Sequence, residues 1–129
     1  MKISTNTEAV KQLKKKFFKL SKQRRKLEYF WVMTLTQDSE LISIKMVSEG
    51  DEDSCVITPE QVFKEPIIKG SRNIIVCHNH PSGKKDPSDY DYTATDKLIE
   101  CSEILGIKVI DHIILTEEDS YSMRDHDEL

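Results

Sequence analysis

The chain has 129 residues, 37% of them hydrophobic and 33% charged, and a formal net charge of −4. This length fits one domain with one hydrophobic core. The composition excludes a membrane-spanning protein, because no run approaches the roughly 18 apolar residues that a span requires. No signal peptide opens the chain, so we expect a cytoplasmic protein without a membrane partner.

Positive charge is concentrated at the start, where residues 1–27 carry ten Lys and Arg and one acidic residue. Apolar residues at spacings of three and four predict a helix over residues 7–27. Its basic side, residues 11–26, leaves two interpretations open. It is either the solvated face of a helix packed on the domain, or a surface that binds nucleic acid or an acidic partner. We therefore divide the chain into a basic N-terminal helix (1–27) and an acidic body (28–129).

The body alternates between patterns typical of strands and of helices. Residues 29–36 and 41–47 predict a hairpin. Thr58 and Pro59 predict the start of a short helix that runs to about residue 64 and that Pro66 bends or ends. The later predicted elements are a central strand (73–80), a helix (88–105) ended by Gly106, an inner strand (108–115) and an edge strand (121–123). This order favours an α/β (α+β) fold, a single domain with a mixed β-sheet flanked by helices.

Two histidines at the end of the predicted central strand indicate a metal site. His78 and His80 are two residues apart, so both imidazoles project from one face of the strand. Asp91 lies in the first turn of the next helix and can supply a third, oxygen ligand. Three protein ligands leave one tetrahedral position for water, which is the arrangement of catalytic rather than structural zinc. The pattern therefore predicts a Zn²⁺ site that activates water.

Each part of this pattern also has a structural interpretation. The histidines could be core or turn residues, and Ser88 with Asp91 has the spacing of a helix cap with an acidic partner. The letters His-Asn-His do not make an HNH nuclease, which spreads these residues over a ββα unit. The H-x-E and P-C-x-x-C signature of nucleobase deaminases is absent. The combined spacing is more specific than its parts.

The string from His78 to Asp91, HNHPSGKKDPSDYD, resembles the JAMM metallopeptidase motif. HNHPSG and the later Asp111-His112-Ile113-Ile114 resemble the RadC branch of that superfamily. The resemblance runs from about Glu28 to Met123 and does not include the basic helix. It implies a three-layer architecture like that of JAMM and cytidine-deaminase domains.

The resemblance also implies residue roles. Zinc would be bound by His78, His80 and Asp91, and Ser88 would hold the metal-bound water or polarise the substrate carbonyl. Glu28, ahead of the first strand, would be the general acid/base, with Glu40 as the competing candidate. The implied activity is that of a zinc metallopeptidase or isopeptidase, which hydrolyses an amide bond of a peptide or protein substrate.

Other positions bear on the same site. Asp111 and His112 could support the ligands or make core hydrogen bonds, and we expect a structural role for them. The chain departs from the family at Gly50-Asp51 and Pro59-Glu60, which indicates a differently shaped substrate groove.

RadC proteins have been linked loosely with DNA repair. The alternative function is therefore a non-catalytic zinc-bearing domain that acts in DNA-associated binding through its basic helix.

Overall fold

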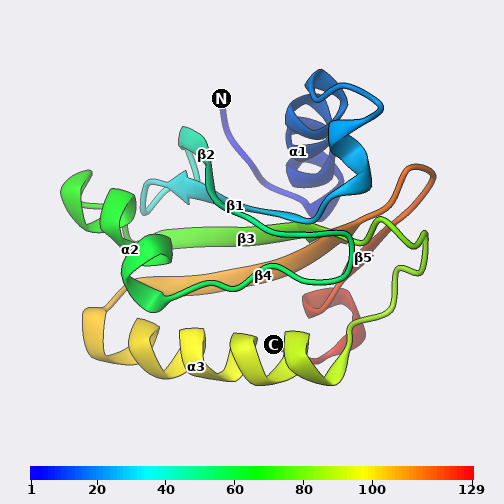
Figure 1. The fold of residues 1–129 in the computed structure, drawn as a ribbon. Coiled ribbons are helices and arrows are strands. Elements are labelled where there is room, and N and C mark those ends of the chain that lie inside the picture. The colour runs from blue at the N-terminus through cyan, green and yellow to red at the C-terminus, as the bar shows by residue number, and fades with distance from the viewer.

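A computed structural model describes all residues, 1–129. Figure 1 shows one five-stranded sheet between helices. The elements in chain order are α1 (Asn6–Lys19), a 3₁₀ turn (Arg24–Lys26), β1 (Tyr29–Leu35), β2 (Leu41–Glu49), α2 (Pro59–Ile68), β3 (Asn73–Asn79), α3 (Asp89–Leu105), β4 (Lys108–Leu115), β5 (Ser120–Ser122) and a second 3₁₀ turn (Arg124–His126). No helix is both long and apolar enough to cross a bilayer.

The sheet is mixed, as the sequence predicts. The strands lie in the order β2-β1-β3-β4-β5, and only β3 and β4 run parallel. Helix α3 joins these two parallel strands, because a parallel pair needs a long crossover connection. The single domain with a mixed sheet and flanking helices is therefore confirmed.

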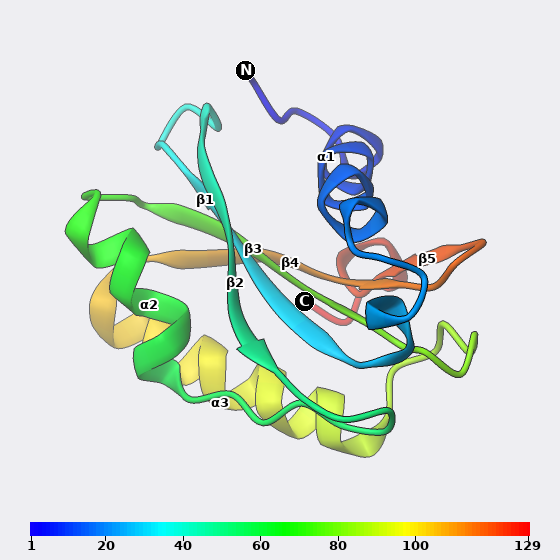
Figure 2. The ribbon, with the colours of Figure 1, turned by 45° about the horizontal axis from the view of Figure 1, so that its top comes forward.

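Two hydrophobic cores lie on opposite faces of the sheet, which gives three layers. Helix α1 covers one face, and α2 and α3 cover the other (Figures 1 and 2). On the α1 side, Leu13 and Phe17 pack with Trp31 and other alternate residues of β1, β3 and β4. On the other side, Phe63 and Leu98 belong to the second cluster. Residues 29–35 are buried throughout because β1 is covered on both faces.

Helix α1 is shorter than the 7–27 expected from the apolar spacing. It ends at Lys19, because Leu20 has extended backbone angles (φ −69°, ψ 143°) and its N–H donates to the Phe17 carbonyl. Leu20 is itself buried in the core, so the chain turns there and brings residues 24–28 back toward the sheet. The predicted end at residue 27 was wrong because Leu27 continues the apolar spacing after the helix has ended.

Helix α2 is longer than expected, running past Pro66 to Ile68. The N-terminal prediction is confirmed, since Thr58 and Gln61 form a capping box ahead of Pro59. The proline lacks one backbone donor, but its ring is buried, and the helix ends only where Gly70 adopts a left-handed φ of 64°. Burial of the ring thus offsets the hydrogen bond that Pro66 cannot donate, and the helix continues through a residue that normally ends one.

Candidate metal centre

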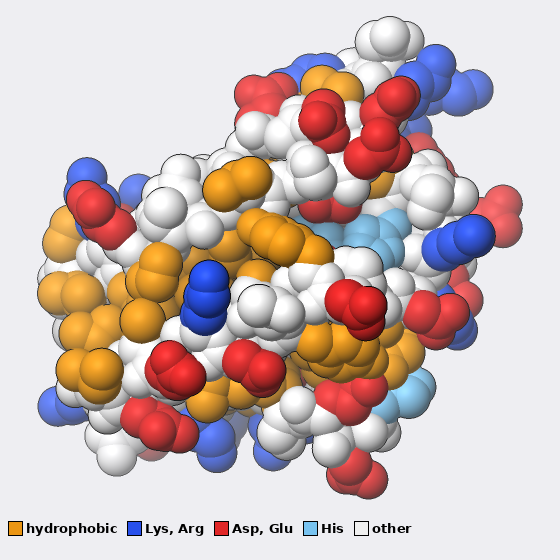
Figure 3. Space-filling model, turned by 60° about the horizontal axis from the view of Figure 1, so that its bottom comes forward, with side chains coloured by type: hydrophobic (Ala, Val, Ile, Leu, Met, Phe, Trp, Pro, Cys, Tyr) orange, Lys and Arg blue, Asp and Glu red, His pale blue; other side chains and the backbone are white.

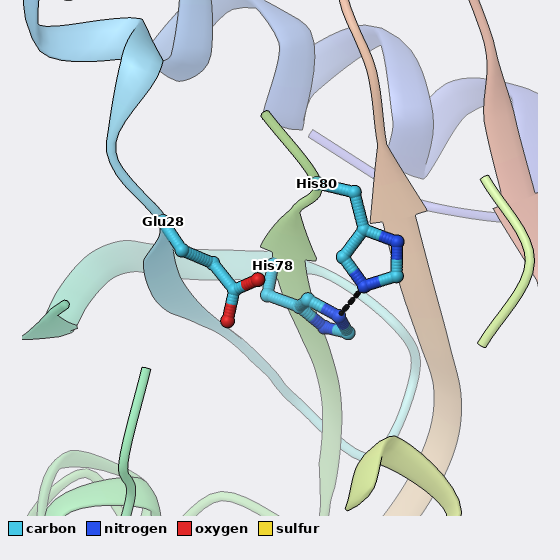
Figure 4. A group of neighbouring side chains, drawn as sticks. All are labelled: Glu28, His78 and His80. Carbon is cyan, nitrogen blue, oxygen red and sulfur yellow. Dashed lines mark hydrogen bonds between the residues drawn. The ribbon is translucent and has the colours of Figure 1, made fainter. Parts of the chain in front are cut away.

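His78 and His80 meet at the end of β3, on the sheet face that α3 covers. Their Nε2 atoms lie 2.9 Å apart (Figure 4). His78 is the last but one residue of the strand and is buried, whereas His80 follows the strand and is partly exposed. Strand alternation therefore places both imidazoles on one face, as the sequence predicts.

Asp91 completes the set from the first turn of α3. Its Oδ1 lies 3.2 Å from His78 Nε2 and its Oδ2 lies 3.0 Å from His80 Nε2. The same carboxylate caps its own helix, because Oδ2 accepts the Ser88 N–H at 2.9 Å. The capping role of Asp91 is therefore confirmed, and it leaves the same carboxylate in contact with both histidines, as a ligand role would require. Ligand atoms around a tetrahedral zinc lie about 3.3 Å apart when each bond is about 2.0–2.1 Å, so little movement separates this arrangement from a bound one.

The hydrogen-bond pattern of His80 shows that this cluster fits a cation. His80 Nδ1 lies 2.8 Å from the Lys84 carbonyl, which can only accept, so Nδ1 carries the proton. In the neutral ring Nε2 then presents a lone pair to a carboxylate oxygen of Asp91, with no proton between them. Only a cation relieves this repulsion, whether a proton on His80 or a metal ion. Two imidazole nitrogens and a carboxylate suit zinc.

The pKa values follow from the same contacts. Burial alone would raise the pKa of Asp91, but hydrogen bonds with His78 and His80, which form when those rings carry a proton on Nε2, outweigh it and hold the pKa far below its ordinary value. Burial would lower the pKa of His80, yet Asp91 and the Lys84 carbonyl raise it above the ordinary value. Burial lowers the pKa of His78, since that ring is fully enclosed. The buried ring is thus kept neutral, as a metal ligand must be.

Glu28 is the acid that the fold brings to the histidines. A carboxylate oxygen of Glu28 lies within 4.8 Å of a ring nitrogen of both His78 and His80, and Figure 4 shows its side chain extending toward them from the start of β1. The competing candidate, Glu40, is exposed at the β1–β2 turn and pairs with the N-terminal amino group at 3.1 Å. The geometry therefore favours Glu28 as the acid/base.

Asn79, the middle residue of the His-Asn-His string, fixes the backbone on both sides of Glu28. Its side chain accepts the Tyr29 N–H at 2.8 Å and donates to the Leu27 carbonyl at 2.9 Å. Alternation points it away from the two imidazoles. One three-residue string thus supplies two candidate metal ligands on one face of β3 and, on the other face, a side chain that fixes the backbone beside Glu28.

The loop after β2 supports Glu28 from the other side. The Glu28 N–H donates to the Asp51 carbonyl and the Gly50 N–H donates to the Glu28 carbonyl, both at 2.8 Å. A Cβ at position 50 would lie 1.9 Å from the Ser54 carbonyl oxygen, so only glycine fits there. Asp51 accepts the N–H groups of Asp53 and Ser54 and folds the loop.

The enclosed position of Glu28 changes its acidity. Only 6% of the residue is exposed. Burial, aided by the nearby charges of Asp91, Asp51 and Asp53, raises its pKa from 4.5 to about 7, against the opposing influence of His80. A carboxyl with this pKa can both take and give a proton near neutral pH.

Ser88 and the residues of β4 occupy supporting positions. The Ser88 hydroxyl accepts the Asp91 N–H at 3.1 Å as the cap of α3 and also lines the cavity at the site. Its role toward water or substrate stays a prediction. Asp111 is buried and accepts the N–H groups of His112 and Arg124 and the Ser122 hydroxyl, which ties down the C-terminal segment. That role is structural, whereas His112 contacts the ligand His78 at 2.7 Å.

A cavity of about 290 Å³ opens over the site and is strongly acidic. Figure 3 shows the imidazoles in a hollow with carboxylates near its rim. Beyond Glu28 and Asp91, the lining carboxylates are Glu52 and Asp53 from the loop after β2 and Asp86 from the loop after β3, with one lysine, Lys84. The outer wall therefore attracts positive charge.

Two site residues, Asn79 and Thr95, had no role in the sequence prediction. Thr95 is buried on α3 one turn after Asp91, with Leu98 and Ser102 following on the same face. A threonine in the buried row of a helix, four residues from a ligand, was the available signal. For Asn79 the signal was a polar residue on the core face of an apolar strand.

Comparisons with known proteins place nearly the whole chain in one family. The profile of the RadC-like JAB domain matches residues 3–128, so it includes α1, which the resemblance seen in the sequence did not. The chain belongs to the RadC-like JAB domain family. A UPF0758 protein of Clostridioides difficile is 43% identical over 101 residues, 78% of this chain and 43% of that protein. A UPF0758 protein of Finegoldia magna is 40% identical over 98 residues, 76% of this chain and 44% of that protein.

A third UPF0758 protein, of Clostridium acetobutylicum, is 43% identical over 88 residues, which are 68% of this chain and 38% of that protein. This RadC-like JAB domain thus spans less than half the length of these curated relatives. Their printed names state no activity, so family membership alone assigns none.

Proposed function

We propose that this RadC-like JAB domain is a zinc-dependent hydrolase that cleaves an amide bond in a peptide or protein. The observation that carries the proposal is the convergence of His78, His80 and Asp91, with the buried acid Glu28 beside them. Three of these four side chains, those of Glu28, His80 and Asp91, line an open cavity. A zinc ion held by these ligands supplies Lewis acidity and lowers the pKa of a bound water to about 7.

The chain's own residues supply the proton transfers. Glu28 accepts the proton of the attacking water and returns it to the leaving nitrogen, which its pKa of about 7 allows in both directions. The clamp by Asn79 and the loop at Gly50 hold the backbone that carries Glu28 in place, so little reorganisation of the backbone accompanies the transfer.

The charge of the cavity wall indicates which substrates the site prefers. Its outer carboxylates, Glu52, Asp53 and Asp86, favour a substrate with lysine or arginine beside the cleaved bond. The loop that carries the first two is folded by Asp51, one of the departures from the family pattern.

The test compares zinc-loaded wild type with Glu28→Gln and Glu40→Gln against a library of fluorescence-quenched peptides. We expect cleavage by the wild type, at basic sequences in preference to acidic ones, and by Glu40→Gln. Glu28→Gln should bind zinc yet lose at least about 100-fold in rate, since general acid–base catalysis contributes about 10²–10⁴-fold. A zinc-loaded wild type that cleaves no peptide in the library would instead favour a non-catalytic binding domain.

A further inference from the structure

Behind the metal ligands, three buried side chains form one continuous row of polar contacts. His78 Nδ1 lies 2.7 Å from His112 Nε2, and His112 Nδ1 lies 2.7 Å from Thr95 Oγ1. The Thr95 hydroxyl is also 2.7 Å from the backbone carbonyl oxygen of Asp91. All three side chains are at most 2% exposed, so no solvent competes for these contacts.

The row can hold its protons in two ways. When the Thr95 hydroxyl donates to the Asp91 carbonyl, it can only accept from His112, so His112 carries its proton on Nδ1. His112 Nε2 then accepts from His78 Nδ1–H, and His78 Nε2 is left with a bare lone pair. The number of protons is the same in the other arrangement, where Thr95 donates to His112 and His78 carries its proton on Nε2, directed at Asp91.

We propose that Thr95 and His112 are positioning residues that set the proton of His78 on Nδ1 and so present its bare Nε2 to the metal ion. This inference rests on the metal centre of the proposed function and adds to it a set of buried hydrogen bonds that fixes the tautomer of one ligand. The backbone carbonyl of Asp91 anchors the row, so the residue that supplies the oxygen ligand also fixes the tautomer of a nitrogen ligand.

Local structure explains why the row is well ordered. Asp91 and Thr95 are four residues apart on α3 and therefore lie one above the other on the same helix face. Phe30 packs against the imidazoles of His78 and His112. Its ring is stacked parallel to His78 (4° between planes, centroids 6.1 Å apart) and edge-on to His112 (72°, 5.7 Å). The ring orientations are thus set by packing as well as by hydrogen bonds.

The chain offers a matched control for testing Thr95. Thr93 makes the same helix-internal bond, from its hydroxyl to the Asp89 carbonyl at 3.1 Å, but it is exposed. The experiment measures the zinc dissociation constant of the full chain by chelator competition for wild type, Thr95→Val, Thr95→Ser and Thr93→Val. We expect Thr95→Val to bind zinc about 10–100-fold more weakly. Thr95→Ser, which keeps the hydroxyl, and Thr93→Val should stay within about twofold of wild type.

Imidazole ¹⁵N chemical shifts of the zinc-loaded wild type give a readout that does not depend on any variant folding. We expect His78 and His112 each to carry a proton on Nδ1. A proton on Nε2 of His112 would overturn the proposal, as would equal zinc affinity of Thr95→Val and Thr93→Val. A wild type that binds no zinc would overturn the metal centre as well, so the two failures are distinguishable.

Discussion

At the scale of single residues, the buried carboxyl of Glu28 lowers the free energy of unfolding of the metal-free protein at neutral pH. Its carboxyl is enclosed by β1, β3 and the loop after β2, where the charged form is poorly solvated. The folded chain therefore holds this proton more tightly than the unfolded chain, whose carboxyl titrates near 4.5 rather than about 7. A group placed for proton transfer thus reduces stability at neutral pH.

Glu28 by itself should make the metal-free protein less stable as the pH rises from 4.5 to 7, because its pKa is raised from 4.5 to about 7 in the folded state. The difference amounts to up to about 3 kcal/mol in the free energy of unfolding. His80, with its raised pKa, acts in the same direction at higher pH, whereas His78 and His112, whose pKa values burial lowers, act in the opposite direction below 6.5. Asp91 acts only below the ordinary pKa of 3.8. Urea unfolding of wild type and Glu28→Gln across this range measures the effect.

Comparison with Glu28→Gln isolates the one carboxyl, because the other groups titrate in both proteins. As the pH rises from 4.5 to 7, the free energy of unfolding of wild type should fall relative to that of Glu28→Gln, and the exposed Glu40→Gln should behave as wild type. Equal pH slopes for wild type and Glu28→Gln would contradict the burial argument.

The convergence of His78, His80 and Asp91 could be predicted from the sequence because local geometry decides it. Two strand residues at a spacing of two share a face, and Asp91 follows after a short loop. The partners of Asn79 and Thr95 could not be predicted in this way. Asn79 bonds the backbone about 50 residues earlier, and Thr95 contacts His112 on another strand. Such pairings follow from strand order, which the sequence pattern does not specify.

At the scale of elements, α1 is an integral layer of the domain. Its apolar residues join the core on one face of the sheet, while its lysines face outward. Arg25, just after it, pairs with Glu117 of the β4–β5 turn at 3.0 Å, with the acid half exposed. The packed-helix interpretation is therefore confirmed, and the binding of nucleic acid or an acidic partner through residues 11–26 stays a prediction.

Adjacent phenylalanines of α1 test its contribution to stability. Phe17 is 1% exposed and Phe18 is 45% exposed. Phe17→Ala should lower the free energy of unfolding by about 3–5 kcal/mol, because it leaves a cavity between α1 and β1. Phe18→Ala should cost less than about 1 kcal/mol. Urea titrations measure both, and similar losses for the two variants would show that α1 is not part of the core.

The expected bounds of the helices failed where tertiary packing overrode local signals. Leu27 continued the apolar repeat of α1 beyond its end at Lys19, and Pro66 did not stop α2 because its ring is buried. The bounds of β4 and the end of α3 at Gly106 were predicted correctly, since an uninterrupted apolar run and a glycine with φ of 69° are local signals.

At the scale of the whole molecule, charge is separated between two regions. The basic residues of α1 lie in the layer above one face of the sheet, and the acidic cavity opens on the side that α3 covers (Figures 1 and 3). Sequence composition predicted this asymmetry but not the cavity, whose wall is formed by two loops 30 residues apart in the chain. Glu28, His80 and Asp91 line that cavity, where a substrate can reach them.

The metal content of the purified chain tests the central claim most directly. Elemental analysis should find about one zinc per wild-type chain, and the zinc should be lost in His80→Ala and Asp91→Ala. His126→Ala, which removes a histidine stacked on Tyr121 away from the site, should keep it. Zinc absent from the folded wild type, or retained equally by Asp91→Ala, would contradict the account.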